Sequence, residues 1–132
     1  MDAGKRILLI DDDMDYIKSF SHILQNRGYD VVAVHSGFQA ISHLETEDFD
    51  LALVDMRMPH MGGLTLLEHI RRRWPSICVI VVTGSSEDSL STESLKKGAF
   101  DYIHKDSIQQ ILSGIERGLK EGVKNKETYA KH

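Results

Sequence analysis

The stretch LALVDMRMPHMGG, residues 51–63, joins an apolar run to an aspartate and then to a turn. Residues 51–54 are apolar at every position, which is typical of a strand buried on both faces of a parallel sheet. Asp55 ends this run, and Pro59 with the glycine pair at 62–63 then turns the chain toward a helix. Because a buried strand seldom ends in a carboxylate, Asp55 is a candidate functional residue.

Four further apolar runs alternate with helical patterns along the chain. The predicted strands are residues 6–10, 30–35, 51–54, 77–82 and 101–104. Apolar residues recur at helical spacing between them, most clearly in the last helix, at Ile108, Ile111, Leu112, Ile115 and Leu119. Such alternation predicts an α/β fold of the (βα)5 type. It is a doubly wound parallel five-stranded sheet, with helices on both faces and right-handed crossovers.

Two segments depart from the regular pattern. Residues 85–94 contain five serines and a threonine, and because serine is a mediocre helix former we expect a short or mobile fourth helix. Beyond Leu119 the apolar periodicity is lost and the chain becomes polar. The sequence therefore predicts one domain over residues 1–120 and a polar tail, or the start of a linker, over 121–132.

Composition narrows the class of protein. With 132 residues, 41% apolar and 27% charged, the chain is long enough for a core of its own. A formal net charge of −4 gives no electrostatic footprint for nucleic acid or for a membrane surface. The longest apolar run, 77–82, is too short to cross a bilayer and contains the single cysteine, Cys78. We expect a buried thiol in a reducing compartment, and hence a cytoplasmic protein.

Polar residues follow four of the predicted strands. In a parallel sheet the carboxyl ends of all strands lie at one edge, so these residues should meet there: Asp11, Asp12, Asp55, Thr83 and Lys105. Each residue alone could simply be solvated, but jointly they predict a site. Clustered carboxylates repel one another unless a cation lies among them, and oxygen ligands favour Mg²⁺ over zinc. An aspartate beside Mg²⁺ and a lysine can attack a phosphoryl group.

From about Lys5 to Leu119, the chain resembles the receiver domain of bacterial two-component response regulators, the CheY-like superfamily. The motifs that carry the resemblance occur in the family's order. They are the acidic pair at 11–12, DMRMP with Asp55, VVTG with Thr83, KKGAFDY with Tyr102, and Lys105. The resemblance implies a flavodoxin-like sheet with the strand order 2-1-3-4-5.

The resemblance also implies the role of each residue in a phosphorelay. Asp55 would accept a phosphoryl group from the phosphohistidine of a sensor histidine kinase or a histidine phosphotransfer protein. Mg²⁺ (or Mn²⁺) would be held by Asp12, by Asp55 and by the backbone carbonyl of Arg57, with Asp11 binding it through water.

Phosphate binding and switching follow from the same resemblance. Thr83 and Lys105 would bind the phosphate, and Thr83 with Tyr102 would form the switch. The switch would act on the face made by helix 4, strand 5 and helix 5, to control an effector domain or protein. Such a domain catalyses only its own phosphotransfer and autodephosphorylation, and no direct binding to nucleic acid or membrane is expected.

One position departs from the family pattern. Receivers usually carry a proline with a cis peptide directly after the active-site lysine, but here the residue is Asp106. Because a cis bond before a residue other than proline costs about 2.5–4 kcal/mol, we predict a trans link and a rearranged loop between strand 5 and helix 5. The departure leaves the pose of Lys105 open.

Two alternatives remain open. One is a degenerate receiver that is never phosphorylated and serves as a docking module. The other is a phosphatase-like enzyme of the haloacid-dehalogenase type, with Asp11 as nucleophile and Asp13 as general acid. That motif requires threonine or valine at the position of Asp15, and the chain has no room for a cap domain.

Overall fold

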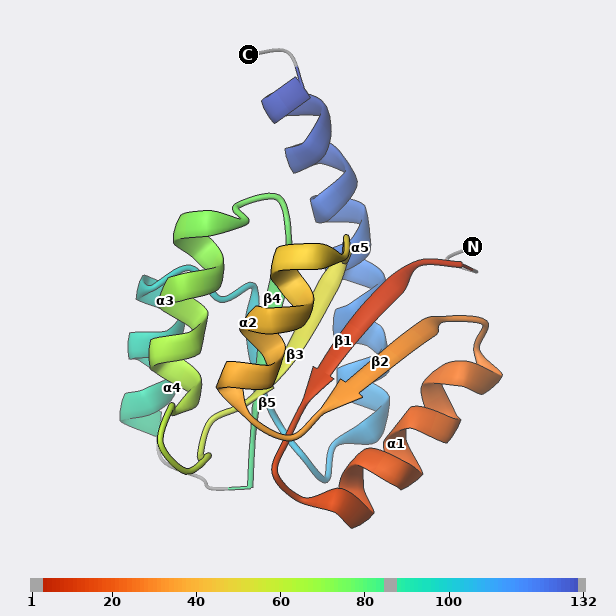
Figure 1. The fold of residues 1–132 in the computed structure, drawn as a ribbon, viewed down its shortest axis with the longest axis vertical. Helices are drawn as coiled ribbons and strands as arrows, with labels where there is room; N and C mark the ends of the chain where they lie inside the picture. Colours follow the sequence, from red (N-terminus) through yellow and green to blue (C-terminus); the bar gives the residue numbers. More distant parts are fainter. Residues whose placement is uncertain (1–3, 85–87, 131–132) are drawn as a thin grey trace.

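The computed structural model describes residues 4–84 and 88–130, with side chains for 4–84 and 90–121. Five parallel strands form one sheet in the order β2-β1-β3-β4-β5 (Figure 1). The strands are β1 (Arg6–Ile10), β2 (Asp30–Val34), β3 (Leu51–Asp55), β4 (Cys78–Thr83) and β5 (Asp101–His104). The helices are α1 (Met14–Asn26), α2 (Gly37–Thr46), α3 (Gly63–Arg73), α4 (Asp88–Lys96) and α5 (Ile108–Ala130). The predicted fold and strand order are confirmed.

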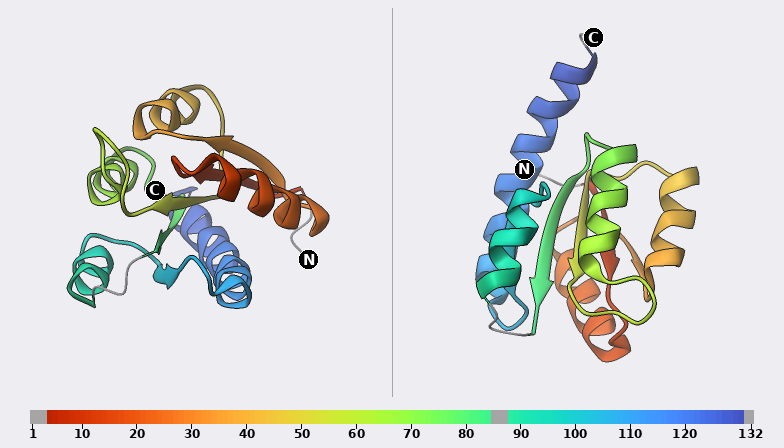
Figure 2. Two further views of the ribbon diagram at one scale, coloured as in Figure 1. Left: turned by 90° about the horizontal axis from the view of Figure 1, so that it is seen from below. Right: turned by 90° about the vertical axis from the view of Figure 1, so that its left-hand side faces the viewer.

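Each strand sends its side chains alternately into two apolar clusters, one on each face of the sheet. Leu8 and Ile10 of β1 pack with α2 and α3, and Leu90 of α4 lies against the same cluster. Ile7 and Leu9 pack on the other face with α1 and α5. Figure 2 shows the helices lying around the sheet on both sides. Because both faces are covered, the strands are apolar at nearly every position, as the sequence predicted.

Both ends of α1 are fixed by local sequence. At the start, the Asp13 side chain caps the helix by accepting hydrogen bonds from the N–H groups of Asp15 and Tyr16. At the end, Gly28 takes a φ of 92°, the left-handed region that favours glycine. The N–H groups of Gly28 and Tyr29 donate back to the last turn of the helix. These caps set where the chain leaves β1 and where it re-enters the sheet.

The two segments that the sequence singled out differ in outcome. α4 has nine residues and is the shortest helix among the described residues, so the prediction of a short helix is confirmed. The first residues of the serine-rich segment, 85–87, lie outside the described residues. α5 continues through the polar segment as far as Ala130, and a domain boundary near residue 120 stays a prediction. No helix in the described part of the chain is both long and apolar enough to cross a membrane.

The end of β3 is held tightly against the start of α3. A Cβ added at Gly63 would lie 2.5 Å from the carbonyl oxygen of Asp55 and 2.7 Å from Cα of Met56. The Gly63 N–H also donates to the Met56 carbonyl at 2.9 Å. Only glycine allows this approach, so Gly63, the second glycine of the GG pair, fixes the loop beside Asp55.

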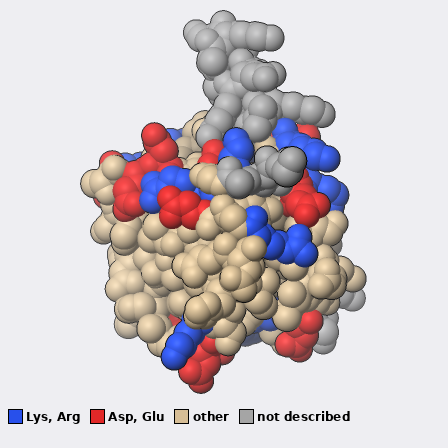
Figure 3. All heavy atoms as spheres, turned by 90° about the vertical axis from the view of Figure 1, so that its right-hand side faces the viewer, with Lys and Arg blue, Asp and Glu red and all other residues tan. Residues whose placement is uncertain are grey.

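On one face of the molecule, charged side chains gather toward the two ends. Figure 3 shows one face, with Lys, Arg, Asp and Glu concentrated toward its upper and lower ends and a mostly uncharged area between them. The strands run from the upper to the lower end in Figure 1, so these ends correspond to the amino and carboxyl edges of the sheet.

Candidate functional site

Three carboxylates meet at the carboxyl edge of the sheet. Asp11 and Asp12 follow β1, and Asp55 ends β3. One oxygen from each lies within 4.8 Å of the others. Asp11 is fully buried and Asp55 is 5% exposed, whereas Asp12 is exposed. The structure therefore brings together residues that lie more than forty positions apart, at the edge where the sequence placed them.

Lys105 extends from the end of β5 into this cluster. Its Nζ lies 2.7 Å from Asp11 Oδ2 and 3.9 Å from Asp55 Oδ1, and its side chain is 17% exposed. Its backbone N–H donates to the Thr83 carbonyl at 2.8 Å, which ties the loop after β5 to the end of β4. Burial acts to lower the pKa of the ammonium, but Asp11 and Asp55 outweigh it, so the pKa is raised and the group stays charged.

The cluster holds more negative charge than its lysine offsets. Burial, and then the charge of Asp11, raises the pKa of Asp55 to about 7, although Lys105 acts in the opposite direction. A further cation would relieve this repulsion. The available donors are all oxygens, which suit Mg²⁺ or Mn²⁺ better than zinc. The residues present therefore fit a hard divalent cation, with Asp12 and Asp55 as the accessible carboxylates.

The remaining site residues lie on β4, on β5 and in the loop after β3. Thr83 ends β4 and is 2% exposed. Tyr102 pairs with Val81 in the register of β4 and β5, and its ring packs against the apolar cluster that contains α3. The Tyr102 hydroxyl is buried and has no hydrogen-bond partner among the described residues, so the ring is turned inward. Arg57 lies two residues beyond Asp55 with an exposed side chain, and the role of its carbonyl stays a prediction.

Comparison with known proteins assigns the family. The model of the response regulator receiver domain matches residues 7–116. The chain belongs to this family. As a receiver domain it is a module of two-component signal transduction, and the resemblance read from its motifs is confirmed.

Two curated relatives show the setting in which similar receiver domains occur. The chain is 36% identical over 110 residues to the transcriptional regulatory protein ZraR of Escherichia coli (strain K12), covering 80% of this chain and 25% of that protein. It is 34% identical over 104 residues to the alginate biosynthesis transcriptional regulatory protein AlgB of Pseudomonas putida, covering 79% and 23%. The chain thus spans about a quarter of the length of these relatives.

Solved structures agree with the fold. A CheY-like response regulator receiver domain protein from Methanospirillum hungatei JF-1 superposes with a TM-score of 0.86 at 36% identity, covering 92% of this chain and 98% of that one. A response regulator from Burkholderia pseudomallei, solved with a phosphorylated aspartic acid, a calcium ion and citrate, gives a TM-score of 0.81 at 25% identity. That match covers 98% of this chain and 76% of the other.

The link after Lys105 has the trans conformation that was predicted from Asp106. No cis peptide bond occurs in the described residues, so the link from Lys105 to Asp106 is trans. The Asp106 N–H, which a proline would lack, donates to Nδ1 of His104 at 3.3 Å. The Ser107 N–H donates to the His104 carbonyl at 3.0 Å. Sequence reasoning missed His104 as an acceptor, because its role depends on the conformation of this turn.

Sequence reasoning also missed Tyr16, in the first turn of α1. The Lys105 Nζ lies 4.5 Å from the centre of the Tyr16 ring. The ring stacks on Phe20, with 5.5 Å between the ring centres. Burial, and then the charge of Asp11, raises the pKa of the Tyr16 hydroxyl above its ordinary value, so the phenol is neutral. The spacing of two aromatic residues, i and i+4, directly after the acidic segment was the available signal.

Proposed function

We propose that Asp55 is the phosphoacceptor of this receiver domain, with a sensor histidine kinase or a histidine phosphotransfer protein as donor. One observation carries the proposal. Asp55 lies at the end of a buried strand, within 4.8 Å of Asp11 and Asp12 and with the Lys105 ammonium 3.9 Å away. The phosphorylated aspartic acid and calcium ion named for the Burkholderia pseudomallei protein support the same chemistry at this edge.

In the proposed step, an Asp55 carboxylate oxygen attacks the phosphorus atom of the phosphohistidine. The P–O bond forms as the P–N bond breaks, and the imidazole nitrogen leaves with the electron pair. Lys105 is placed to neutralise charge on the transferring oxygens, and Thr83 would donate a hydrogen bond to one of them. Asp12, Asp55 and the Arg57 carbonyl would hold Mg²⁺ or Mn²⁺, with Asp11 binding through water. When bound, the ion would supply further charge neutralisation.

The surroundings of Asp11 favour Asp55 over Asp11 as the nucleophile. Asp11 is fully buried, and its Oδ1 accepts the N–H of Asp13 at 2.9 Å. Its Oδ2 lies 2.7 Å from Lys105. A carboxylate occupied on both oxygens and closed to solvent is poorly placed to attack a donor, whereas Asp55 retains some exposure. This argues against the phosphatase-like alternative.

Output is proposed to pass through the face made by α4, β5 and α5. Phosphorylation would add about −1.5 to −2 charge beside Lys105 and Thr83, and Thr83 with Tyr102 would relay the change. Leu95 of α4 and Ile108 of α5 are 48% and 39% exposed, which offers apolar contacts to an effector domain or protein. α4 is short and serine-rich, which suits it to respond.

Phosphorylation with a small donor tests the proposal directly. The chain would be incubated with Mg²⁺ and acetyl phosphate, and the modified residue mapped by mass spectrometry, with Asp55→Asn as the matched control. We expect one phosphoryl group on Asp55 and none in the variant. Label on Asp11 would support the phosphatase-like alternative, and a folded chain that takes no label would support the docking module.

A further inference from the structure

The active-site lysine stands on a loop whose backbone is fixed but whose side chain needs a separate restraint. The Lys105 N–H donates to the Thr83 carbonyl, at the end of β4. The next two N–H groups donate to His104, that of Asp106 to Nδ1 and that of Ser107 to the carbonyl. The lysine side chain beyond Cα has four rotatable bonds, and fixing it costs rotamer entropy. Something must therefore hold the ammonium in place.

Among the described residues, three groups lie beside that ammonium. Two are carboxylates, Asp11 at 2.7 Å and Asp55 at 3.9 Å. The third is the Tyr16 ring, whose centre is 4.5 Å from Nζ, inside the range of about 6 Å for a cation–π interaction. The interaction is stronger when the cation is withdrawn from water, and the Lys105 side chain is only 17% exposed. The carboxylates attract the ammonium, and the ring packs against it on one side.

Tyr16 is itself held rigidly by the same acidic segment. Its N–H donates to Asp13 Oδ1 at 3.2 Å, and the Asp13 N–H donates to Asp11 Oδ1 at 2.9 Å. Phe20 stacks on the ring at an interplanar angle of 14°. A closed circuit of contacts therefore runs from Asp11 through Asp13 and Tyr16 to Lys105 and back to Asp11. Within it, contacts that do not involve the lysine hold the ring in position.

The hydroxyl of Tyr16 takes no part in this circuit. It is buried and has no hydrogen-bond partner among the described residues. The part of the residue that contacts the lysine is the ring, which phenylalanine would keep and leucine would not. This separates the effect of the ring from that of the hydroxyl in an experiment.

We propose that Tyr16 is a positioning residue for phosphoryl transfer: its ring holds the Lys105 ammonium beside Asp11 and Asp55 in a receiver that has aspartate after the lysine. The inference rests on the proposed phosphorylation of Asp55. Without the ring, Lys105 would sample more rotamers and spend less time beside the transferring oxygens. The rate at saturating donor should fall, while the donor concentration for half-maximal rate changes little.

The kinetic experiment compares Tyr16→Leu with Tyr16→Phe, using Mg²⁺ and acetyl phosphate. We expect the maximal phosphorylation rate of Tyr16→Leu to fall about fivefold to tenfold, and that of Tyr16→Phe to stay within about twofold of the parent chain. Tyr29→Leu is the matched control. Tyr29 is a buried tyrosine at the other end of α1, so its loss should lower stability without changing the rate. Equal rates for Tyr16→Leu and Tyr29→Leu would overturn the inference, as would equal losses for Leu and Phe at position 16.

A spectroscopic readout does not depend on phosphorylation. The side-chain methylene protons of Lys105 should be shielded by the ring current of Tyr16 in carbon–proton NMR spectra of the parent chain and of Tyr16→Phe. They should move to unshielded positions in Tyr16→Leu. Unshielded Lys105 protons in the parent chain would overturn the inference even if Tyr16→Leu failed to fold. A parent chain with shielded Lys105 protons but no label on Asp55 would overturn the proposed function and leave the contact established.

Discussion

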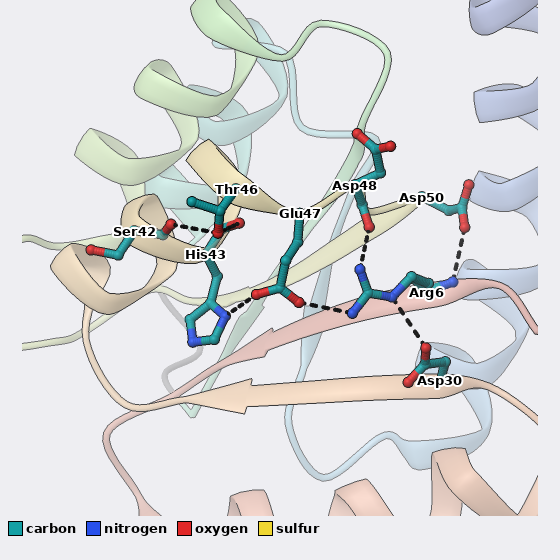
Figure 4. A network of polar contacts seen from close by, with 8 residues as sticks. All are labelled: Arg6, Asp30, Ser42, His43, Thr46, Glu47, Asp48 and Asp50. Carbon is teal, nitrogen blue, oxygen red and sulfur yellow. Dashed lines mark hydrogen bonds and ion pairs between the residues drawn. The ribbon is translucent and has the colours of Figure 1, made fainter.

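Acidic residues lie at both edges of the sheet, but they are paired with cationic side chains to different extents. At the amino edge, Arg6 at the start of β1 binds the Asp30 carboxylate at 3.1 Å, Glu47 at 2.9 Å and the Asp48 carbonyl at 2.9 Å (Figure 4). Its backbone N–H donates to Asp50 at 2.8 Å. At the carboxyl edge, three carboxylates lie close together, and the Lys105 ammonium lies beside two of them, Asp11 and Asp55.

The pKa of a carboxyl group at each edge is shifted, and the two shifts have opposite directions. The hydrogen bond from Arg6, followed by that of His43, lowers the pKa of Glu47, so its charged form is stabilised. Burial and the charge of Asp11 raise the pKa of Asp55 to about 7, so its charged form is destabilised. A gathering of acidic residues is therefore not a site in itself. An acidic cluster becomes a candidate site when its buried negative charge is not balanced by neighbouring cationic side chains. A bound cation can then supply the positive charge.

The largest effect should come from removing the uncompensated charge. Without metal, Asp55→Asn should stabilise the fold at about pH 8 by on the order of 2 kcal/mol. The pKa of Asp55 is about 7 in the folded chain against an ordinary value of 3.8, so the folded state binds the proton more tightly. The stability that this proton confers is present below about pH 4 and is lost as the pH rises to about 7.

Urea unfolding with a chelator checks this prediction. The gap in the free energy of unfolding between Asp55→Asn and the parent chain should be larger at about pH 8 than at about pH 5. Asp50→Asn at the amino edge is the matched control. Because it replaces a charged acceptor of the Arg6 N–H by a neutral one, it should destabilise the chain. Equal gaps at the two pH values would contradict the difference between the edges.

Magnesium affinity should depend on the carboxyl edge alone. Asp12→Ala should weaken Mg²⁺ binding by at least about tenfold, because Asp12 is the exposed member of the carboxylate cluster. Asp30→Ala removes the same charge from an exposed position at the amino edge and should leave the affinity unchanged. Titration calorimetry, or the rise in unfolding midpoint with Mg²⁺, measures the Mg²⁺ affinity of the two variants. Equal weakening in the two variants would indicate non-specific attraction by net charge.

Much of the carboxyl edge could be predicted because a parallel sheet brings its strand ends together. That rule placed Asp11, Asp55 and Lys105 at one edge without any contact being known. It also predicts the amino edge: Arg6, Asp30 and Asp50 stand at or just before the starts of three strands. The same reading of strand starts would have found the arginine network.

What the sequence could not supply was the pairing within each cluster. Lys105 lies closer to Asp11 than to Asp55, and the Tyr16 ring flanks its ammonium, so the pairing depends on the directions of these side chains. Such directions depend on rotamers and loop conformation, which residue spacing does not encode. The trans link to Asp106 followed from the cost of a cis bond before aspartate.

Breaking the compensated edge should cost stability and leave phosphorylation intact. Arg6→Met should lower the unfolding midpoint at neutral pH by about 5 °C, because Asp30 and Glu47 lose their partner and Phe49 loses the guanidinium 4.7 Å from its ring centre. The pKa of Glu47 is lowered in the fold. The stability it contributes is therefore present above its ordinary pKa and is lost as the pH falls through the lowered value, so the deficit should shrink in acid.

Thermal melts at about pH 7 and about pH 3 test this, together with the phosphorylation rate. The rate in Arg6→Met should stay within about twofold of the parent value, because Arg6 lies at the opposite edge from Asp55. A deficit that grows in acid would contradict the assigned role of Glu47. A large fall in rate would show that the two edges are coupled.

The smallest effect concerns a left-handed residue that is not glycine, in the loop at the carboxyl edge. His60, in the loop after Asp55, has a φ of 69° and is the one non-glycine residue in the left-handed region among those described. This conformation costs a residue other than glycine about 1 kcal/mol. Glycine avoids that strain but loses more chain entropy on folding, so His60→Gly should stabilise the fold by about 0.5 kcal/mol. Ser76→Gly, in the loop before β4 at the amino edge, should destabilise it, as its φ is not positive. Equal losses in urea unfolding would mean that the edges differ in charge alone.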